Sequence, residues 1–179
     1  VGRQQRAHPR GERAVTGVYG TMASIVRLPD GALVIANTTQ PDWVDGGHFD
    51  GLYNYITLHL EQQGGFVWAQ GLPPEAWYVP SVIPGNSARR IGYSEDTYVP
   101  RQDGATYENQ WSAALSTGVE PQMVTITSFN EWHEGSEIES IAASVDNGRG
   151  YTYADFGTLL PGGYILLTHD WVERFLSQS

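Results

Sequence analysis

The sequence predicts an α/β fold built on parallel strands. Apolar runs with the two-residue alternation of β-strands occur at 49–56, 77–82 and 124–129, and helix-like stretches separate or follow them. Strands that alternate with helices pair in parallel through right-handed crossovers. Functional groups in such sheets gather at the carboxyl ends of the strands, so a site is expected there.

The N-terminal region is predicted to contain an arm and a hairpin. Residues 1–14 are polar, arginine-rich and without periodicity, which indicates a disordered basic arm. Two apolar runs, 24–28 and 32–36, flank the turn signal Pro-Asp-Gly at 29–31. This pattern predicts a β-hairpin within 15–38.

Three helices and one long loop are predicted further along. A short helix at 57–63 ends at two glycines, and a helix at 106–117 starts with Thr106 as its cap. A loop at 85–105 is of the length that usually carries function. The longer helices each have one apolar face, made by Tyr107, Trp111, Ala114 and Leu115 in the first and by Tyr164, Leu167, Thr168, Trp171, Val172, Phe175 and Leu176 in the C-terminal one.

Composition limits the class of partner. The net charge is −10, with ten arginines and no lysine, which argues against nucleic acid and anionic membranes. A neutral glycan fits better, and six Trp, ten Tyr and five Phe supply flat faces for sugar rings or for a core. Cysteine is absent, so neither a disulfide framework nor a cysteine metal site is expected. No apolar run approaches the ~20 residues of a membrane span.

The most informative stretch is 121–139. Its apolar strand changes abruptly into Asn-Glu-Trp-His-Glu-Gly at 130–135. Charged groups at a buried strand end are costly unless they have partners or a chemical role. Glu131 and Glu134 could serve as the two carboxyl groups of a glycosidase, because their mutual repulsion would raise one pKa and keep that group protonated. A solvated acidic turn would have the same composition.

Metal binding is the competing interpretation for this stretch. Glu131, His133, Glu134 and Glu137 are all metal-ligating types, but there is no His-Glu-x-x-His pattern and the spacing fits no helix-face pair. The sequence also lacks a phosphate-cradling glycine motif and a Ser-His-Asp arrangement. No metal and no cofactor are therefore predicted.

Three segments resemble one enzyme family. Residues 127–139, Thr-Ser-Phe-Asn-Glu-Trp-His-Glu-Gly-Ser-Glu-Ile-Glu, resemble the last-strand motif of the endo-α-1,2-mannosidases, family ninety-nine of the glycoside hydrolases, and of their bacterial relatives. Phe-Asp-Gly-Leu-Tyr-Asn-Tyr at 49–55 and Val-Pro-Ser-Val-Ile-Pro-Gly at 79–85 resemble two further strand motifs, in the family's order. The resemblance covers 49–175 and implies that 15–179 forms the C-terminal part of a (β/α)8 TIM-like barrel. A complete barrel needs about 250 residues.

The resemblance implies a retaining glycosidase that acts on α-mannoside-type glycans. Glu134 would be the general acid/base that protonates the departing oxygen. Glu131 would deprotonate the sugar 2-hydroxyl, which attacks C1 and gives a 1,2-anhydro sugar that water opens. The sequence does not distinguish this role of Glu131 from that of a direct nucleophile.

Other residues of these motifs are candidate substrate contacts. Tyr53 matches the family tyrosine that reaches into the site, although a barrel-filling tyrosine would match equally. Asn130 and His133 would hydrogen-bond the substrate or orient a carboxylate, and Trp132 would stack on a sugar ring or pack in the core.

The segment after the third motif supplies two more candidates. Gly85 suits close approach of the backbone to a ligand, and Arg89 or Arg90 would correspond to the family's arginine after this turn. Asn86 stands where the family usually has tyrosine, a departure that affects substrate specificity more than the reaction.

The alternative function is a non-catalytic glycan-binding or structural remnant of such a barrel. An incomplete barrel would expose strand edges and apolar surface. It is therefore expected to pack against a second copy or an N-terminal half. A leader ahead of Val1 would favour an extracellular or periplasmic location.

Overall fold

The computed structural model describes most of the chain between residues 32 and 178. The described ranges are 32–55, 65–88, 97–141 and 156–178, together with the backbone of two strands at 13–16 and 23–26.

The described strands confirm the parallel α/β prediction. β3 (Ile35–Asn37) pairs with β4 (Gly51–Tyr53), β4 pairs with β5 (Trp77–Val79), and β6 (Ser81–Val82) pairs with β7 (Thr125–Ile126), all in parallel. Only Pro80 separates β5 from β6, and its carbonyl accepts a hydrogen bond from Thr125 N at 2.9 Å. The segment formed by β5, Pro80 and β6 therefore pairs with β4 along its first part and with β7 along its second, and parallel neighbours that follow one another in the chain are typical of (β/α)8 barrels.

The hairpin prediction for 15–38 is wrong in its pairing. β1 (Arg13–Thr16) pairs antiparallel with β2 (Ala23–Val26), whereas β3 joins the parallel sheet. Asp50 helps to hold β3 there, because its Oδ2 accepts from Val34 N at 2.8 Å while its own N donates to Val34 O at 2.8 Å. β1 also includes two residues assigned to the basic arm, and 1–12 and 27–31 lie outside the described residues.

Short helical segments connect some of the strands. They are α1 (Trp43–Gly46), η1 (Val67–Gly71) and η4 (Gln102–Gly104). The helix predicted at 57–63 lies outside the described residues.

The two longer predicted helices are confirmed as α2 (Ala105–Leu115) and α3 (Gly163–Ser177). The cap prediction is wrong: Gly104 is the N-cap, and Thr106 Oγ1 instead donates to Pro100 O at 2.5 Å. Leu176, placed on the apolar face by periodicity, is exposed near the end of α3. None of the described helices has the length and apolar character needed to cross a membrane.

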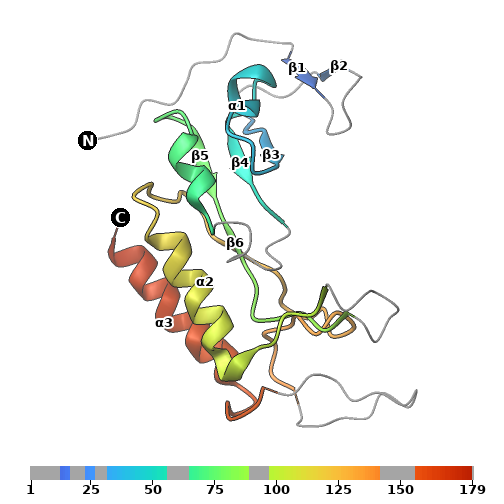
Figure 1. Cartoon of the computed structure of the whole chain (residues 1–179), viewed down its shortest axis with the longest axis vertical. Coiled ribbons are helices and arrows are strands. Elements are labelled where there is room, and N and C mark those ends of the chain that lie inside the picture. Colours follow the sequence, from blue (N-terminus) through green and yellow to red (C-terminus); the bar gives the residue numbers. More distant parts are fainter. Residues whose placement is uncertain are drawn as a thin grey trace.

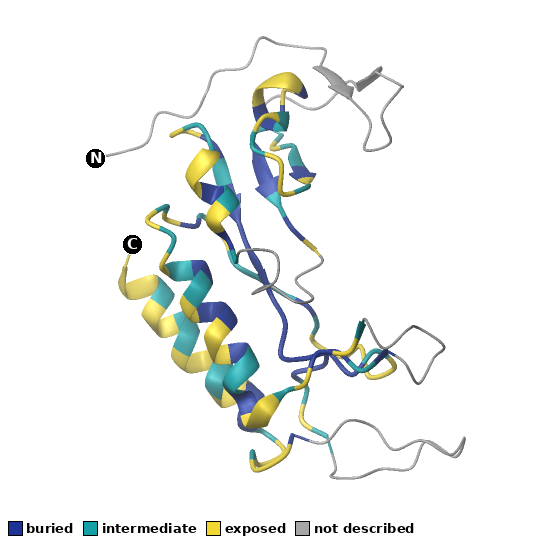
Figure 2. Cartoon of the chain, viewed as in Figure 1, coloured by how far each residue is buried: buried dark blue, intermediate teal, exposed yellow. Residues whose placement is uncertain are grey.

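α2 and α3 lie side by side and cover one face of the β6 region (Figure 1). The Trp111 and Trp171 rings stack between them, 6.1 Å apart and 6° from parallel. Val82 and Ile126 face the same core, which also contains Tyr78 and Tyr107. The buried positions therefore follow the strands, the inner side of α2 and the first residues of α3 (Figure 2).

Two side-chain amides accept backbone hydrogen bonds from residues 81 and 83, beyond the point where β5 is paired with β4. Beyond Tyr53, the Asn54 Oδ1 accepts from Ser81 N at 3.3 Å, and the Gln110 Oε1 of α2 accepts from Ile83 N at 2.8 Å. Val79 is paired with Tyr53 of β4, and Ser81 and Ile83 follow it at two-residue intervals. Their N–H groups therefore point to the same side of the strand as that of Val79. The amides thus satisfy the backbone while the carboxyl ends of β4 and β6 separate.

Candidate active site

The stretch at 128–139 forms a closed loop at the carboxyl end of β7. Thr127 N still donates to Val82 O at 2.9 Å, but regular pairing ends there, so the strand is shorter than the predicted 124–129. Ser128 N then donates to Ser136 O at 2.9 Å, and Glu139 N donates to Phe129 O at 2.9 Å. The two ends of the loop therefore run side by side and hold 130–135 at its tip.

Both candidate catalytic glutamates lie at this tip. Glu131 is exposed, and its N donates to Ser128 Oγ at 2.8 Å. Glu134 is half-buried. Gly135, with φ of 60°, makes the turn that follows, as its position in the sequence predicts.

The environment of Glu134 favours its protonated form. Burial raises the pKa of Glu134, and the negative charge of Glu131 raises it further. Burial is the larger of these two causes, whereas the sequence prediction rests on repulsion alone. A carboxyl group with a raised pKa retains its proton to higher pH, which is what a general acid requires.

Replacing Glu131 with glutamine is expected to lower the pKa of Glu134 only partly. The substitution removes the neighbouring charge but leaves the burial that contributes more to the shift. A ¹³C NMR titration of Glu134 in both proteins measures this. A pKa of Glu134 that returns fully to the ordinary glutamate value would contradict the assignment of burial as the main cause.

Polar side chains line the sheet face opposite to α2. Tyr53, at the end of β4, makes a side-chain hydrogen bond with Thr125 of β7, and burial is the main cause that raises its pKa. Next to it, Ser81 Oγ and Thr127 Oγ1 are 2.8 Å apart. Tyr53 therefore reaches across the strands toward the base of the loop at 128–139, which we call the glutamate loop.

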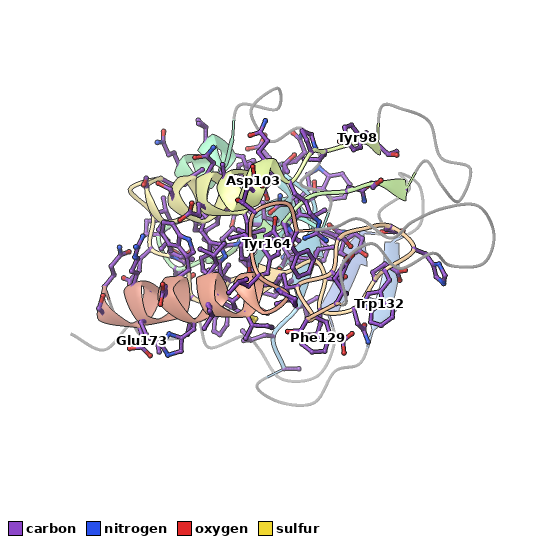
Figure 3. All side chains as sticks on the ribbon, turned by 90° about the horizontal axis from the view of Figure 1, so that it is seen from below. Tyr98, Asp103, Phe129, Trp132, Tyr164 and Glu173 are labelled. Atoms are coloured by element: carbon purple, nitrogen blue, oxygen red, sulfur yellow. The ribbon has the colours of Figure 1, made fainter. Side chains whose placement is uncertain are left out.

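The other candidates of the loop tip are exposed. Asn130, Trp132 and His133 all lie on its surface, and 37% of Trp132 is accessible, so Trp132 is not a core residue. In Figure 3, Trp132 and Phe129 lie well away from Glu173 of α3. Residues 130–134 are consecutive in the chain and all lie at the tip of this loop.

Gly85 is not part of this tip. Gly85 is buried, and a Cβ on it would approach Arg101 Cγ to 2.6 Å and Val99 O to 3.0 Å. Its missing side chain therefore accommodates a neighbouring segment of this chain. Arg89 lies outside the described residues.

The structure adds a buried ion pair behind the loop tip. Glu137 is fully buried, and its Oε2 lies 3.1 Å from Nη2 of Arg101, whose side chain is 9% exposed. The sequence pattern presents Glu137 only as one acid among several, and Arg101 only as part of a long loop. The signal that could have found the pair is the position of Glu137 next to the apolar residue Ile138, which is typical of a buried segment. A buried carboxylate needs a cationic partner, and an arginine elsewhere in the chain is the natural candidate.

No metal-binding cluster occurs in the part of the chain that the structure describes. Groups of three or more His, Cys, Asp or Glu residues with suitable geometry are absent from it. The tip at 130–135 carries Glu131 and Glu134, with polar and aromatic side chains next to them in the chain.

Residues 29–177 match the family model described as glycosyl hydrolase family 99. A zebrafish (Danio rerio) glycoprotein endo-alpha-1,2-mannosidase-like protein is 34% identical over 163 residues, which cover 83% of this chain and 34% of that protein. The mouse (Mus musculus) glycoprotein endo-alpha-1,2-mannosidase is 33% identical over 159 residues, covering 80% of this chain and 32% of the relative. The chain thus spans about a third of the length of these relatives.

A solved structure supports the same relationship. The GH99 endo-alpha-mannosidase from Bacteroides thetaiotaomicron superposes with a TM-score of 0.64 at 28% identity, over 82% of this chain and 45% of that one. The family match, the identities and the shared fold agree, and the chain belongs to glycosyl hydrolase family 99.

Proposed function

We propose that this chain carries the acid/base half of a retaining glycosidase that cleaves α-mannoside-type glycans. The observation that carries the proposal is the pair Glu131 and Glu134 on one loop at a strand carboxyl end, with the pKa of Glu134 raised by burial and by Glu131. Membership of the family and the names of its relatives support α-mannosides as the substrate class.

In the first step, Glu134 donates its proton to the departing glycosidic oxygen. Glu131 accepts the proton of the sugar 2-hydroxyl, and the oxygen so released attacks C1. The C1 bond to the leaving oxygen breaks, and a 1,2-anhydro sugar forms. In the second step, Glu134 takes a proton from water and the water oxygen attacks C1. The C1–O2 bond of the anhydro ring breaks, and Glu131 returns its proton to O2. The two inversions give net retention, and both glutamates regain their starting states.

The other residues would bind and orient the sugar. Trp132 offers an exposed ring for stacking, and Asn130 and His133 lie close enough in sequence to the glutamates to hydrogen-bond a substrate held between them. Tyr53 would face the site from the polar side of the sheet. The acidic chain, with its net charge of −10, suits a neutral glycan better than an anionic one.

The test is the anomer that forms first from an α-1,2-linked mannosyl oligosaccharide. Proton NMR during hydrolysis by the full chain is expected to show the α-anomer before mutarotation. Initial release of the β-anomer would contradict retention. Saturable binding without hydrolysis, measured by calorimetry, would instead favour the glycan-binding alternative, and the absence of both would reject the proposed function.

A further inference from the structure

We infer that Arg101 is a positioning residue that holds the backbone of the glutamate loop in its reactive geometry. The inference rests on the proposed function, because it concerns the same site. Arg101 belongs to none of the motifs that carry the family resemblance, and it precedes Glu134 by more than thirty residues.

Arg101 contacts the loop directly after Glu134. Its Nη2 lies 3.1 Å from Gly135 O, 2.8 Å from Glu137 O and 3.1 Å from Glu137 Oε2. One guanidinium group thus binds two backbone carbonyls on either side of Ser136 and the carboxylate of Glu137. Hydrogen bonds from a charged donor are about twice as strong as neutral ones, so this group fixes the direction of the chain as it leaves Glu134.

The guanidinium group is itself held by aromatic rings. Its Cζ lies 4.8 Å from the centre of the Phe156 ring and 4.7 Å from that of Tyr164, and these two rings meet edge to face at 4.7 Å. Tyr164 lies near the middle of the molecule, at the start of α3 (Figure 3). Cation–π contacts on a desolvated arginine are strong enough to define its orientation.

A second anchor comes from the same part of the chain. Ser87 N donates to Glu134 O at 2.6 Å, and Asn86 exchanges backbone hydrogen bonds of 2.8 Å with Val99 in both directions. The carbonyls of Glu134 and Gly135 are therefore bound by two segments that are linked to each other. The Glu134 side chain projects from a backbone that is fixed at both of these points.

Stability alone does not account for the ion pair. Burying a carboxylate and a guanidinium costs desolvation free energy, and apolar replacements of buried ion pairs are often neutral or stabilising. An apolar pair, however, cannot bind the carbonyls of Gly135 and Glu137. The arginine therefore fixes the position of the loop backbone at the site. This matters because misplacing a catalytic group by about 1 Å can lower the reaction rate about 100-fold.

The test compares Arg101→Lys and the double variant Arg101→Met/Glu137→Met with Arg174→Met. Lysine keeps the charge but lacks the planar guanidinium group that lies over the Phe156 and Tyr164 rings and directs Nη2 to the loop. The double variant removes both buried charges together. Arg174 also lies over an aromatic ring, with its Cζ 4.5 Å from the centre of Trp171, but it is exposed on α3 and far from the loop in sequence. Thermal unfolding first establishes that each variant is folded.

The readout that does not depend on activity is amide hydrogen exchange. Both Arg101 variants are expected to exchange about tenfold faster in 128–139, the effect of losing a charge-assisted hydrogen bond, while α2 exchanges as in the wild type. Arg174→Met is expected to match the wild type in both segments. Unchanged exchange at 128–139, or an equal increase in α2, would overturn the inference.

Kinetics supply the second readout. In the Arg101 variants kcat is expected to fall on the order of 100-fold with KM little changed. The basic limb of the pH profile is expected to move to lower pH, because a loosened loop exposes Glu134 and lowers the pKa of the acid. A wild-type chain without hydrolysis would reject the proposed function, while the exchange comparison would still decide the role of Arg101.

Discussion

The Glu134→Gln variant is expected to hydrolyse an unactivated α-mannosyl oligosaccharide about 10²–10⁴-fold more slowly than the wild type. Glutamine has nearly the shape of a protonated glutamic acid but cannot deliver a proton to the departing oxygen. Binding of the glycan is expected to persist, because the loop backbone is held by Ser87 and Arg101 rather than by the Glu134 side chain. Steady-state kinetics and calorimetry measure the two effects separately.

The leaving group provides a sharper version of this experiment. A mannoside whose leaving group departs without protonation is expected to be cleaved by Glu134→Gln with a much smaller loss, since acid assistance is then dispensable. The matched control is Glu108→Gln, which changes an exposed carboxylate in the first turn of α2 and is expected to leave both rates unchanged. Equal losses on both substrates would show that Glu134 is not the acid.

The Trp111→Ala variant is expected to lose about 3–5 kcal/mol of unfolding free energy. Trp111 is 1% exposed and stacks on Trp171, and its ring also meets Tyr107 at 6.2 Å. Truncation removes one of the contacts that join α2 to α3 and leaves a cavity between them. Urea unfolding followed by far-ultraviolet circular dichroism measures the loss without relying on tryptophan emission.

Leu166→Ala is the control for this substitution. Leu166 lies on α3 but is 66% exposed, so its truncation is expected to change the unfolding free energy by less than about 0.5 kcal/mol. If Trp111→Ala loses less than about 1 kcal/mol of unfolding free energy, the packing of Trp111 between α2 and α3 does not contribute to stability as expected.

Local patterns predicted the elements that bury one clear face. The spacing of Tyr107, Trp111 and Ala114 defines α2 because a 3.6-residue period places them on one side of the helix. The strand before Asn130 is similarly visible as an apolar run, although its regular pairing is short. Glu131 and Glu134 stand out because charged residues interrupt that run.

Interactions between distant residues could not be predicted in this way. The turn signal at 29–31 predicts a hairpin that includes residues 35–37, because it acts on residues close in the chain. The observed parallel pairing of β3 with β4 instead involves a hydrogen bond from Val34 to Asp50, 16 residues away. The pair formed by Arg101 and Glu137 joins residues 36 positions apart, and neither lies in a periodic pattern. The larger cause of the raised pKa of Glu134 is burial, which depends on tertiary structure.

The amides of Asn54 and Gln110 have a consequence for the range of conditions under which the sheet keeps its shape. They accept hydrogen bonds from Ser81 and Ile83 where β4 and β6 part. Neither side chain gains or loses a proton between acidic and alkaline solution, so the spacing of these strand ends stays constant while Glu134 cycles between its two charge states. An aspartate or glutamate at either position would make the frame titrate together with the acid that it supports.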